Sequence, residues 1–192
     1  MHPIHHTEGF ILDSRGFGEA NKYFFIFTKD FGLLCAAAQG IRKVNSKLKF
    51  SLQDFSHVRI DLVRGKSIWR ITNAEKISAP FAFGSPSLPT VASIFSLIKR
   101  MCHGEEKNEE LYAVLCELAS LTEANHLSED DMKNLECVTV SKVLQSLGYL
   151  PSGSTASFLC VSPLSLQSIE DARKSRREIV ATINEALKST QL

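Results

Sequence analysis

Residues 7–38 read TEGFILDSRGFGEANKYFFIFTKDFGLLCAAA, and their pattern predicts three short β-strands. Residues 9–13 form a short apolar run, and residues 21–28 contain the aromatic run YFFIF, which is too short for a typical helix. Residues 30–32 (Asp-Phe-Gly) are a turn signal, and apolar residues 33–38 follow directly. Strands that are separated by a few connecting residues form β-hairpins. We therefore expect the second and third strands to pair.

Two further strands follow a long connection over residues 39–52. Residues 55–62 alternate between apolar and polar side chains, residues 64–66 (Arg-Gly-Lys) suit a turn, and residues 68–73 alternate again. Five short strands without intervening crossover helices favour a small closed or nearly closed β-barrel, of which the OB-fold is the common five-stranded type. An SH3-like barrel fits the pattern almost as well.

The apolar residues take a helical period after residue 89. Residues 80–89 are rich in Pro, Ser and Gly and are typical of a linker. Helical spacing marks four segments, at about 91–103, 111–121, 128–148 and 168–188, and Ser128 with Asp131 suits a helix start. The predicted fold class is α+β: an OB-fold barrel domain at residues 1–79, followed by an all-helical domain at residues 80–192.

The composition and the charge distribution limit the kinds of protein that this chain can be. The 192 residues are 44% hydrophobic and 22% charged, with a mean hydropathy of −0.03, which excludes a mainly disordered or collagen-like chain. Residues 1–80 carry 12 Lys and Arg against 7 Asp and Glu, whereas residues 81–192 carry 10 against 14. This asymmetry suggests a polyanion-binding module joined to a second module. The sequence shows no membrane-spanning run and no signal-peptide pattern, so the expected location is the cytoplasm.

The cations of the front half are concentrated in residues 39–70, which contain eight Lys and Arg but only two Asp and no Glu. Basic loops beside a β-surface are typical of nucleic-acid binding that does not read sequence, because cations neutralise phosphates and aromatic rings stack on bases. A solvated loop is the alternative. Trp69 is expected in the core rather than on a stacking surface. The residues predicted to contact DNA are Arg42, Lys43, Lys47, Lys49, Arg64, Lys66 and Arg70.

No motif in the sequence favours an enzyme. Residues 40–47 do not match the phosphate-binding P-loop, and residues 15–20 contain only two glycines of a dinucleotide fingerprint and precede a strand. The five cysteines are odd in number and scattered, without a C-x-x-C pair, so we expect free thiols. The sequence therefore predicts no catalytic residues, no cofactor and no metal site.

Several short segments resemble the start of the bacterial RecO recombination-mediator family. The matching segments are TEGFIL (7–12), RGFGEANK (15–22), FTKDFGL (27–33), AQGIRK (38–43), SKL (46–48), LQDF (52–55), GKSIW (65–69) and TNAE (72–75). Their order and spacing agree over roughly residues 7–77. The resemblance implies an OB-fold followed by a helical domain. It also implies a nucleoid-associated protein that binds single- and double-stranded DNA, anneals strands, and works with RecR and single-strand-binding protein to load recombinase.

The second half departs from this family. Residues 147–151 (LGYLP) resemble the approach to a four-cysteine zinc module, but only Cys160 follows, and structural zinc needs four ligands. We therefore expect no zinc module. In the family, a basic hydrophobic groove of the helical domain receives the acidic C-terminal tail of single-strand-binding protein. The residues predicted to bind this partner are Arg173, Lys174, Arg176 and Arg177. A solvated helix face is the alternative for this cluster. Two other functions remain open: a protein-interaction adaptor acting through the helical domain, and an RNA-binding OB protein.

Overall fold

The computed structural model describes residues 3–79, 81, 84–151 and 153–190. The chain divides into two compact units. The first, here called the barrel unit, comprises Met1–Ala82 and Cys102–Tyr112, and the second, the helical unit, comprises Phe83–Met101 and Ala113–Leu192. The assignment of separate functions to residues 1–79 and 80–192 stays a prediction.

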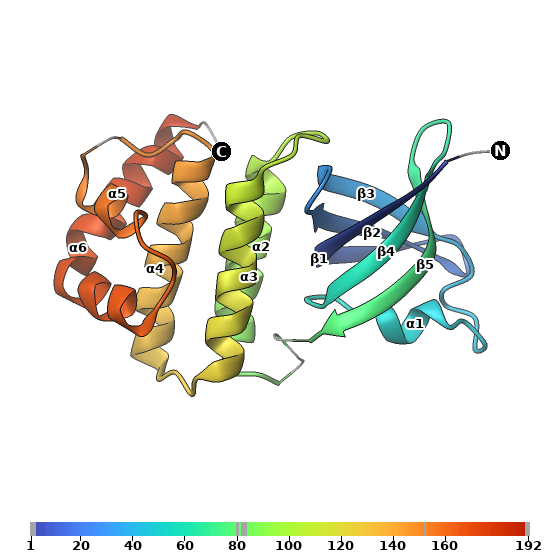
Figure 1. Cartoon of the computed structure of the whole chain (residues 1–192), viewed down its shortest axis with the longest axis horizontal. Helices are drawn as coiled ribbons and strands as arrows, with labels where there is room; N and C mark the ends of the chain where they lie inside the picture. The colour runs from blue at the N-terminus through green and yellow to red at the C-terminus, as the bar shows by residue number, and fades with distance from the viewer. Residues whose placement is uncertain (1–2, 80, 82–83, 152, 191–192) are drawn as a thin grey trace. The chain divides into compact units, whose positions relative to one another are not determined.

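Five strands form the barrel unit. They are β1 (Ile4–Phe17), β2 (Asn21–Thr28), β3 (Gly32–Ala38), β4 (His57–Arg64) and β5 (Trp69–Ser78). The strands close into a barrel in the order β1-β2-β3-β5-β4 (Figure 1). Neighbouring strands are antiparallel except β3 and β5, which run parallel. This closed five-stranded Greek-key barrel confirms the predicted OB-fold.

Alternation along the strands builds the barrel core. Phe24 and Ile26 of β2 are fully buried in one hydrophobic cluster, together with Leu34, which lies opposite Ile26 on β3. Trp69 belongs to the same cluster and is only 4% exposed. The prediction that Trp69 packs internally is therefore confirmed.

A β-bulge at Leu12 explains why β1 is longer than the predicted strand. Ile11 pairs with Ile26, but the next pair joins Asp13 to Phe25, so Leu12 has no partner on β2. A bulge bends its strand and increases the local twist. Here the bend allows β1 to pair first with β4 and then with β2.

The long connection between β3 and β4 contains the short helix α1 (Leu48–Ser51). Ile41 and Leu52 are buried in the barrel cluster, and Leu48 packs against it. The apolar residues of the connection thus attach it to the core. Gly40, at φ +66°, begins the connection in a left-handed conformation that favours glycine.

The helical unit contains α2 (Leu88–Met101), α4 (Glu129–Ser146), α5 (Thr155–Leu159) and α6 (Leu166–Ser189), together with most of α3 (Glu109–Ala124). The predicted start at Ser128 is confirmed, because its hydroxyl accepts from the Asp131 N–H while the Asp131 carboxylate accepts from the Ser128 N–H. Helix α5 lies outside the four helical segments that the sequence predicted.

Helix α4 is the central helix of this unit. Eleven of its 18 residues are buried, and it contacts α2, α5 and α6. Lys142 of α4, 8% exposed, donates to the carbonyl of Cys160 after α5 (3.3 Å) and lies 3.7 Å from the Glu117 carboxylate. A buried cation with these partners fixes the end of α5 against α4. Among the described residues, no helix is both long and apolar enough to cross a membrane.

Candidate nucleic-acid interface

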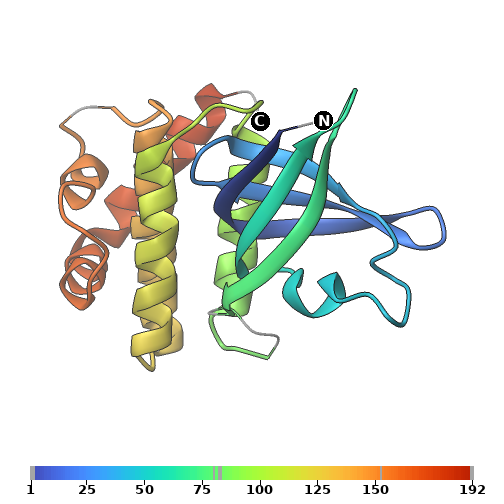
Figure 2. The same ribbon diagram turned by 45° about the vertical axis from the view of Figure 1, so that its right-hand side comes forward.

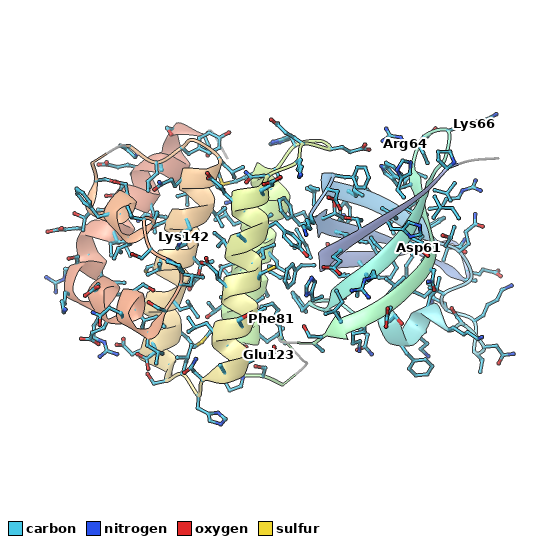
Figure 3. The ribbon with its side chains drawn as sticks, in the orientation of Figure 1. Asp61, Arg64, Lys66, Phe81, Glu123 and Lys142 are labelled. Atoms are coloured by element: carbon cyan, nitrogen blue, oxygen red, sulfur yellow. The ribbon has the colours of Figure 1, made fainter. Side chains whose placement is uncertain are left out.

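The seven cations predicted to contact DNA lie in two groups. Arg42, Lys43, Lys47 and Lys49 occupy the connection around α1, while Arg64, Lys66 and Arg70 lie at the β4–β5 hairpin. All seven are exposed. Figure 3 labels Arg64 and Lys66 near the tip of that hairpin, away from the short helix α1. The structure therefore does not gather the predicted residues into one cluster.

Backbone hydrogen bonds hold the first group beside the β1–β2 hairpin. The Arg42 N–H donates to the Ala20 carbonyl (3.0 Å), and the Gly40 N–H donates to Asn21 Oδ1 (2.9 Å). Both acceptors are in or next to the turn that joins β1 to β2. Figure 2 shows this blue hairpin end next to the cyan connection. Arg42 is thus fixed at the end of the barrel where β1 and β2 meet.

The connection also exposes apolar side chains among its cations. Phe50 is 71% exposed and Val44 is 91% exposed. An exposed aromatic ring between basic side chains suits stacking on an unpaired base. Sequence analysis considered only Trp69 among the rings of this basic stretch and expected it in the core, because the exposure of Phe50 depends on how the connection packs. Phe50 is therefore a candidate stacking residue that sequence reasoning missed.

A row of side chains crosses the outer face of the barrel. Arg15, Tyr23, Ala37 and Arg70 are successive register partners on β1, β2, β3 and β5. The neighbouring row that contains Phe24, Ala36 and Trp69 lies in the core, so the first row points outward. Three strand spacings separate Arg15 from Arg70, which is about 14 Å. The row spans the face between the two groups of predicted cations.

Aromatic rings lie along this row. Phe17 stacks on Tyr23 with ring centroids 3.8 Å apart and planes 12° from parallel. The guanidinium of Arg15 lies 5.8 Å from the ring centroid of Phe25. We call Arg15, Phe17, Tyr23, Phe25 and Arg70 the outer band. The outer face of strands 2 and 3 is the usual ligand surface of OB-folds. The band therefore combines cations and rings where such a fold binds oligonucleotides.

Some of the barrel's cations form ion pairs with acidic side chains, and others do not. Arg64 pairs with Glu105, and Arg59 of the same strand pairs with Glu8 (2.8 Å) and Glu75 (3.2 Å). Within the described part of the chain, the other six predicted cations form no ion pair; they are Arg42, Lys43, Lys47, Lys49, Lys66 and Arg70. Free cations can replace counterions on a phosphate backbone without first losing a protein partner.

The predicted partner-binding cluster on α6 is largely paired with acids of its own unit. Arg173 lies 2.6 Å from the Asp131 carboxylate and also contacts Asp130 and Glu170. Lys174 pairs with Asp171 at 3.1 Å, Arg176 pairs with Asp130 at 3.3 Å, and Arg177 is exposed. Much of the cluster's charge therefore balances the first turn of α4, which carries three acids.

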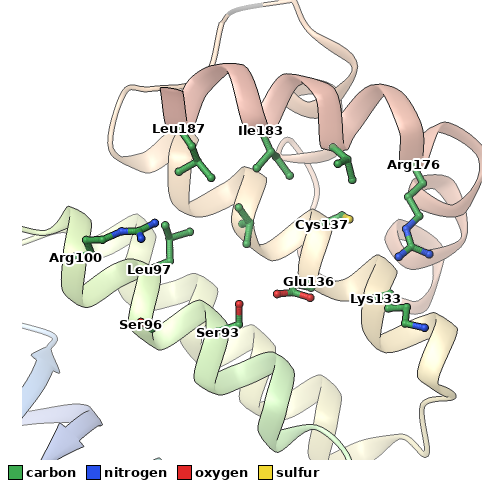
Figure 4. A pocket seen from close by; sticks show the side chains of 12 residues that line it. Ser93, Ser96, Leu97, Arg100, Lys133, Glu136, Cys137, Arg176, Ile183 and Leu187 are labelled. Carbon is green, nitrogen blue, oxygen red and sulfur yellow. The ribbon is translucent and has the colours of Figure 1, made fainter. Parts of the chain in front are cut away.

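A groove of about 470 Å³ lies in the helical unit between α2, α4 and α6 (Figure 4). Its apolar lining residues include Leu97, Val140, Val180, Ile183 and Leu187. Three cations, Arg100, Lys133 and Arg176, and one acid, Glu136, also line it. Arg176 is the member of the predicted cluster that reaches the groove. Arg100 and Lys133 were missed, because only helix packing brings their separate segments together.

The cysteines show no metal chemistry in the described residues. No three His, Cys, Asp or Glu side chains gather there as a metal site. None of the five cysteines, all of which the structure describes, forms a disulfide bond. Burial raises the pKa of both Cys102 and Cys160 to about 11, so these thiols stay protonated at neutral pH and are poor nucleophiles and metal ligands.

Residues 1–80 match the family model described as "Recombination protein O N terminal". Proteins named "DNA repair protein RecO" are similar over longer stretches. The relative from Heliobacterium modesticaldum is 27% identical over 150 residues, covering 77% of this chain and 53% of the relative. That from Alkaliphilus metalliredigens is 30% identical over 111 residues, covering 57% and 45%. The chain thus spans about half the length of these relatives. Residues 1–80, which close into the five-stranded barrel, are therefore similar to the N-terminal domain of the RecO family.

Proposed function

We propose that this chain is a non-enzymatic DNA repair protein that binds single- and double-stranded DNA through its barrel without reading sequence. The observation that carries the proposal is the outer band of a barrel that matches the RecO N-terminal model. Among the described residues, Arg70 at one end of the band and Arg42 beside the other end form no ion pair, whereas Arg15 pairs with Asp13 at 3.6 Å. The protein would act in the cytoplasm on nucleoid DNA, with residues 1–79 binding DNA and residues 80–192 binding partners.

The proposed mechanism is charge neutralisation followed by pairing. Two complementary strands repel each other until basic side chains replace their counterions. Rings such as Tyr23 and Phe50 can stack on bases of any identity, which keeps an unpaired strand on the barrel without selecting its sequence. Base pairing then proceeds with its own free energy. Together with RecR and single-strand-binding protein, a protein with these activities would help to load recombinase.

The direct test is a salt titration of binding to labelled single-stranded oligonucleotides, combined with an assay of complementary-strand annealing. If the six free cations each contact a phosphate, the logarithm of the binding constant falls with a slope of about −4 against the logarithm of salt concentration. Competition with RNA of equal length separates this function from that of an RNA-binding OB protein. Absence of salt-dependent binding to any oligonucleotide would contradict the proposal.

A second function, that of an adaptor, is favoured by the groove of the helical unit. Its apolar floor suits a hydrophobic or aromatic side chain, and Arg100, Lys133 and Arg176 provide charge for an acidic segment. We propose that this groove receives the acidic C-terminal tail of single-strand-binding protein. The paired residues Arg173 and Lys174 would then contribute less than Arg176.

The adaptor proposal is tested by titrating the full chain with a labelled acidic-aromatic tail peptide. We expect Arg100→Glu to weaken peptide binding by at least about tenfold, because reversal of a groove cation adds repulsion to the lost attraction. Arg177→Glu is the matched control, since it makes the same charge change on an exposed residue that does not line the groove. If the wild-type chain does not bind the tail peptide at high micromolar peptide concentration, the adaptor proposal is contradicted.

A further inference from the structure

An acidic side chain from outside the β-strands occupies the β4–β5 end of the barrel unit. Residues 102–108 form an irregular segment that belongs to this unit. Glu105 of the segment forms an ion pair with Arg64, and its other oxygen accepts a 2.9 Å hydrogen bond from Trp69 Nε1. One carboxylate thus binds a cation that the sequence assigned to DNA.

Arg64 and Trp69 together form a preorganised pair of donors. The Arg64 guanidinium carbon lies 4.8 Å from the centroid of the Trp69 ring, which is in cation–π range. Trp69 is buried in the core, and its N–H is directed to the Glu105 carboxylate. The ring is further held by edge contacts with His5 and tilted packing against Phe31. Neither donor needs to reorganise in order to bind an anion.

The same two donors suit a phosphodiester. A phosphate group presents two anionic oxygens, as a carboxylate does, and guanidinium groups bind either anion through charge-assisted hydrogen bonds. The Arg64 side chain is 57% exposed and the Glu105 side chain is 37% exposed, so a strand can reach the site from solvent. An exposed ion pair of this kind contributes little to stability, so another anion can displace Glu105 at a small cost in free energy.

We propose that Arg64 and Trp69 Nε1 form a phosphate-binding site for a nucleic-acid backbone, which Glu105 occupies in the free protein and leaves when a strand binds. This inference rests on the proposed DNA binding. Glu105 acts as an internal competitor, because a phosphate that binds Arg64 must first break the Arg64–Glu105 pair. The irregular backbone of residues 102–108 provides a segment that can move without unwinding a helix.

The test compares single-stranded DNA affinities of the full chain and its Glu105→Gln variant. The amide oxygen of Gln can still accept from Trp69, but it no longer holds Arg64 by charge. We expect Glu105→Gln to bind about threefold more tightly at low salt, the size expected for release of one exposed ion pair. Glu106→Gln is the matched control, because it removes the same charge one residue away, and we expect an unchanged affinity.

A second background tests whether the gain passes through Arg64. In an Arg64→Ala chain, Glu105→Gln should give no gain, and a gain that persists there would overturn the proposal. Equal gains for Glu105→Gln and Glu106→Gln would also overturn it, because they would show a general charge effect.

Tryptophan fluorescence gives a second test. Trp69 is the only tryptophan in the sequence, so its emission reports on the site in the wild-type chain. Its spectrum should change when DNA saturates the protein, and an unchanged spectrum counts against displacement. A wild-type chain that binds no DNA would instead refute the proposed function.

Discussion

His57 is a half-buried histidine inside the barrel unit. Its ring stacks on Phe10 with centroids 4.3 Å apart and planes 7° from parallel, and its Nε2 shares a 2.9 Å hydrogen bond with the Tyr112 hydroxyl. Burial lowers the pKa of His57 below its ordinary value; Glu8 opposes this shift and Arg59 adds to it. The folded protein therefore favours the neutral imidazole.

This shift predicts a loss of stability in mild acid. Because the pKa of His57 is lower in the folded state, the unfolded chain takes up a proton first as the pH falls below ~6.5. The free energy of unfolding should be highest above this pH and decrease as the pH falls toward the folded-state pKa. Urea unfolding followed by Trp69 fluorescence at pH 8, 6.5 and 5.5 measures the effect in the barrel unit.

Two variants isolate the contribution of His57. His57→Phe keeps a ring against Phe10 but cannot titrate, so it should lose about 1 kcal/mol at pH 8 through the missing hydrogen bond and show a flatter decline below pH 6.5. His126→Gln alters an exposed histidine of the helical unit and should leave the decline in the barrel unit unchanged. A wild-type decline that His57→Phe fails to flatten would assign the acid sensitivity to other groups.

Residue type alone predicts which side chains carry charge, but not which charges are free. Arg59, Arg64 and Lys66 lie close together in the sequence, and only the structure shows that the two arginines have acidic partners. Those partners, such as Glu105, come from distant parts of the chain. Phe50 illustrates the same limit, since its exposure depends on which apolar residues of the connection pack into the core.

At the scale of elements, local patterns predicted most of the fold. Alternation and turn residues identified five strands, and helical spacing with the Ser128 cap identified the long helices, because these signals depend on near neighbours in sequence. The bulge at Leu12 and the resulting length of β1 were not predicted. They depend on pairing with two other strands at once.

The outer band could not be predicted for a related reason. Arg15, Tyr23 and Arg70 lie far apart in the sequence and share a row only through strand register. A shift of one residue would turn each of them to the other face. The segment Cys102–Tyr112 belongs to the barrel unit although it is distant from the strands in sequence. A periodic pattern in the sequence does not predict such a long-range contact.

At the scale of the whole molecule, the front half of the chain is basic and the back half is acidic. This difference is consistent with the proposal that the two halves have different functions. The basic residues of the front half include six free cations on the barrel unit, whereas the cations of α6 mostly balance nearby acids. If DNA binding depends on the local arrangement of free cations, equal changes in net charge should have unequal effects on affinity. If it depends on net charge alone, the position of the change should not matter.

Reversal of Arg42 and Lys43 to Glu distinguishes these cases. The double variant changes the net charge from +1 to −3 and removes two of the proposed phosphate contacts at the β1–β2 end. We expect at least about tenfold weaker binding to single-stranded DNA and a salt slope that is shallower by about 1.4. Lys133→Glu with Lys188→Glu makes the same change in net charge on exposed cations of the helical unit. The affinity of this control variant for DNA should fall far less.

Equal losses of affinity in the two variants would mean that DNA binding depends on net charge alone. An unchanged affinity in a folded Arg42→Glu, Lys43→Glu chain would mean that the connection between β3 and β4 does not contact DNA.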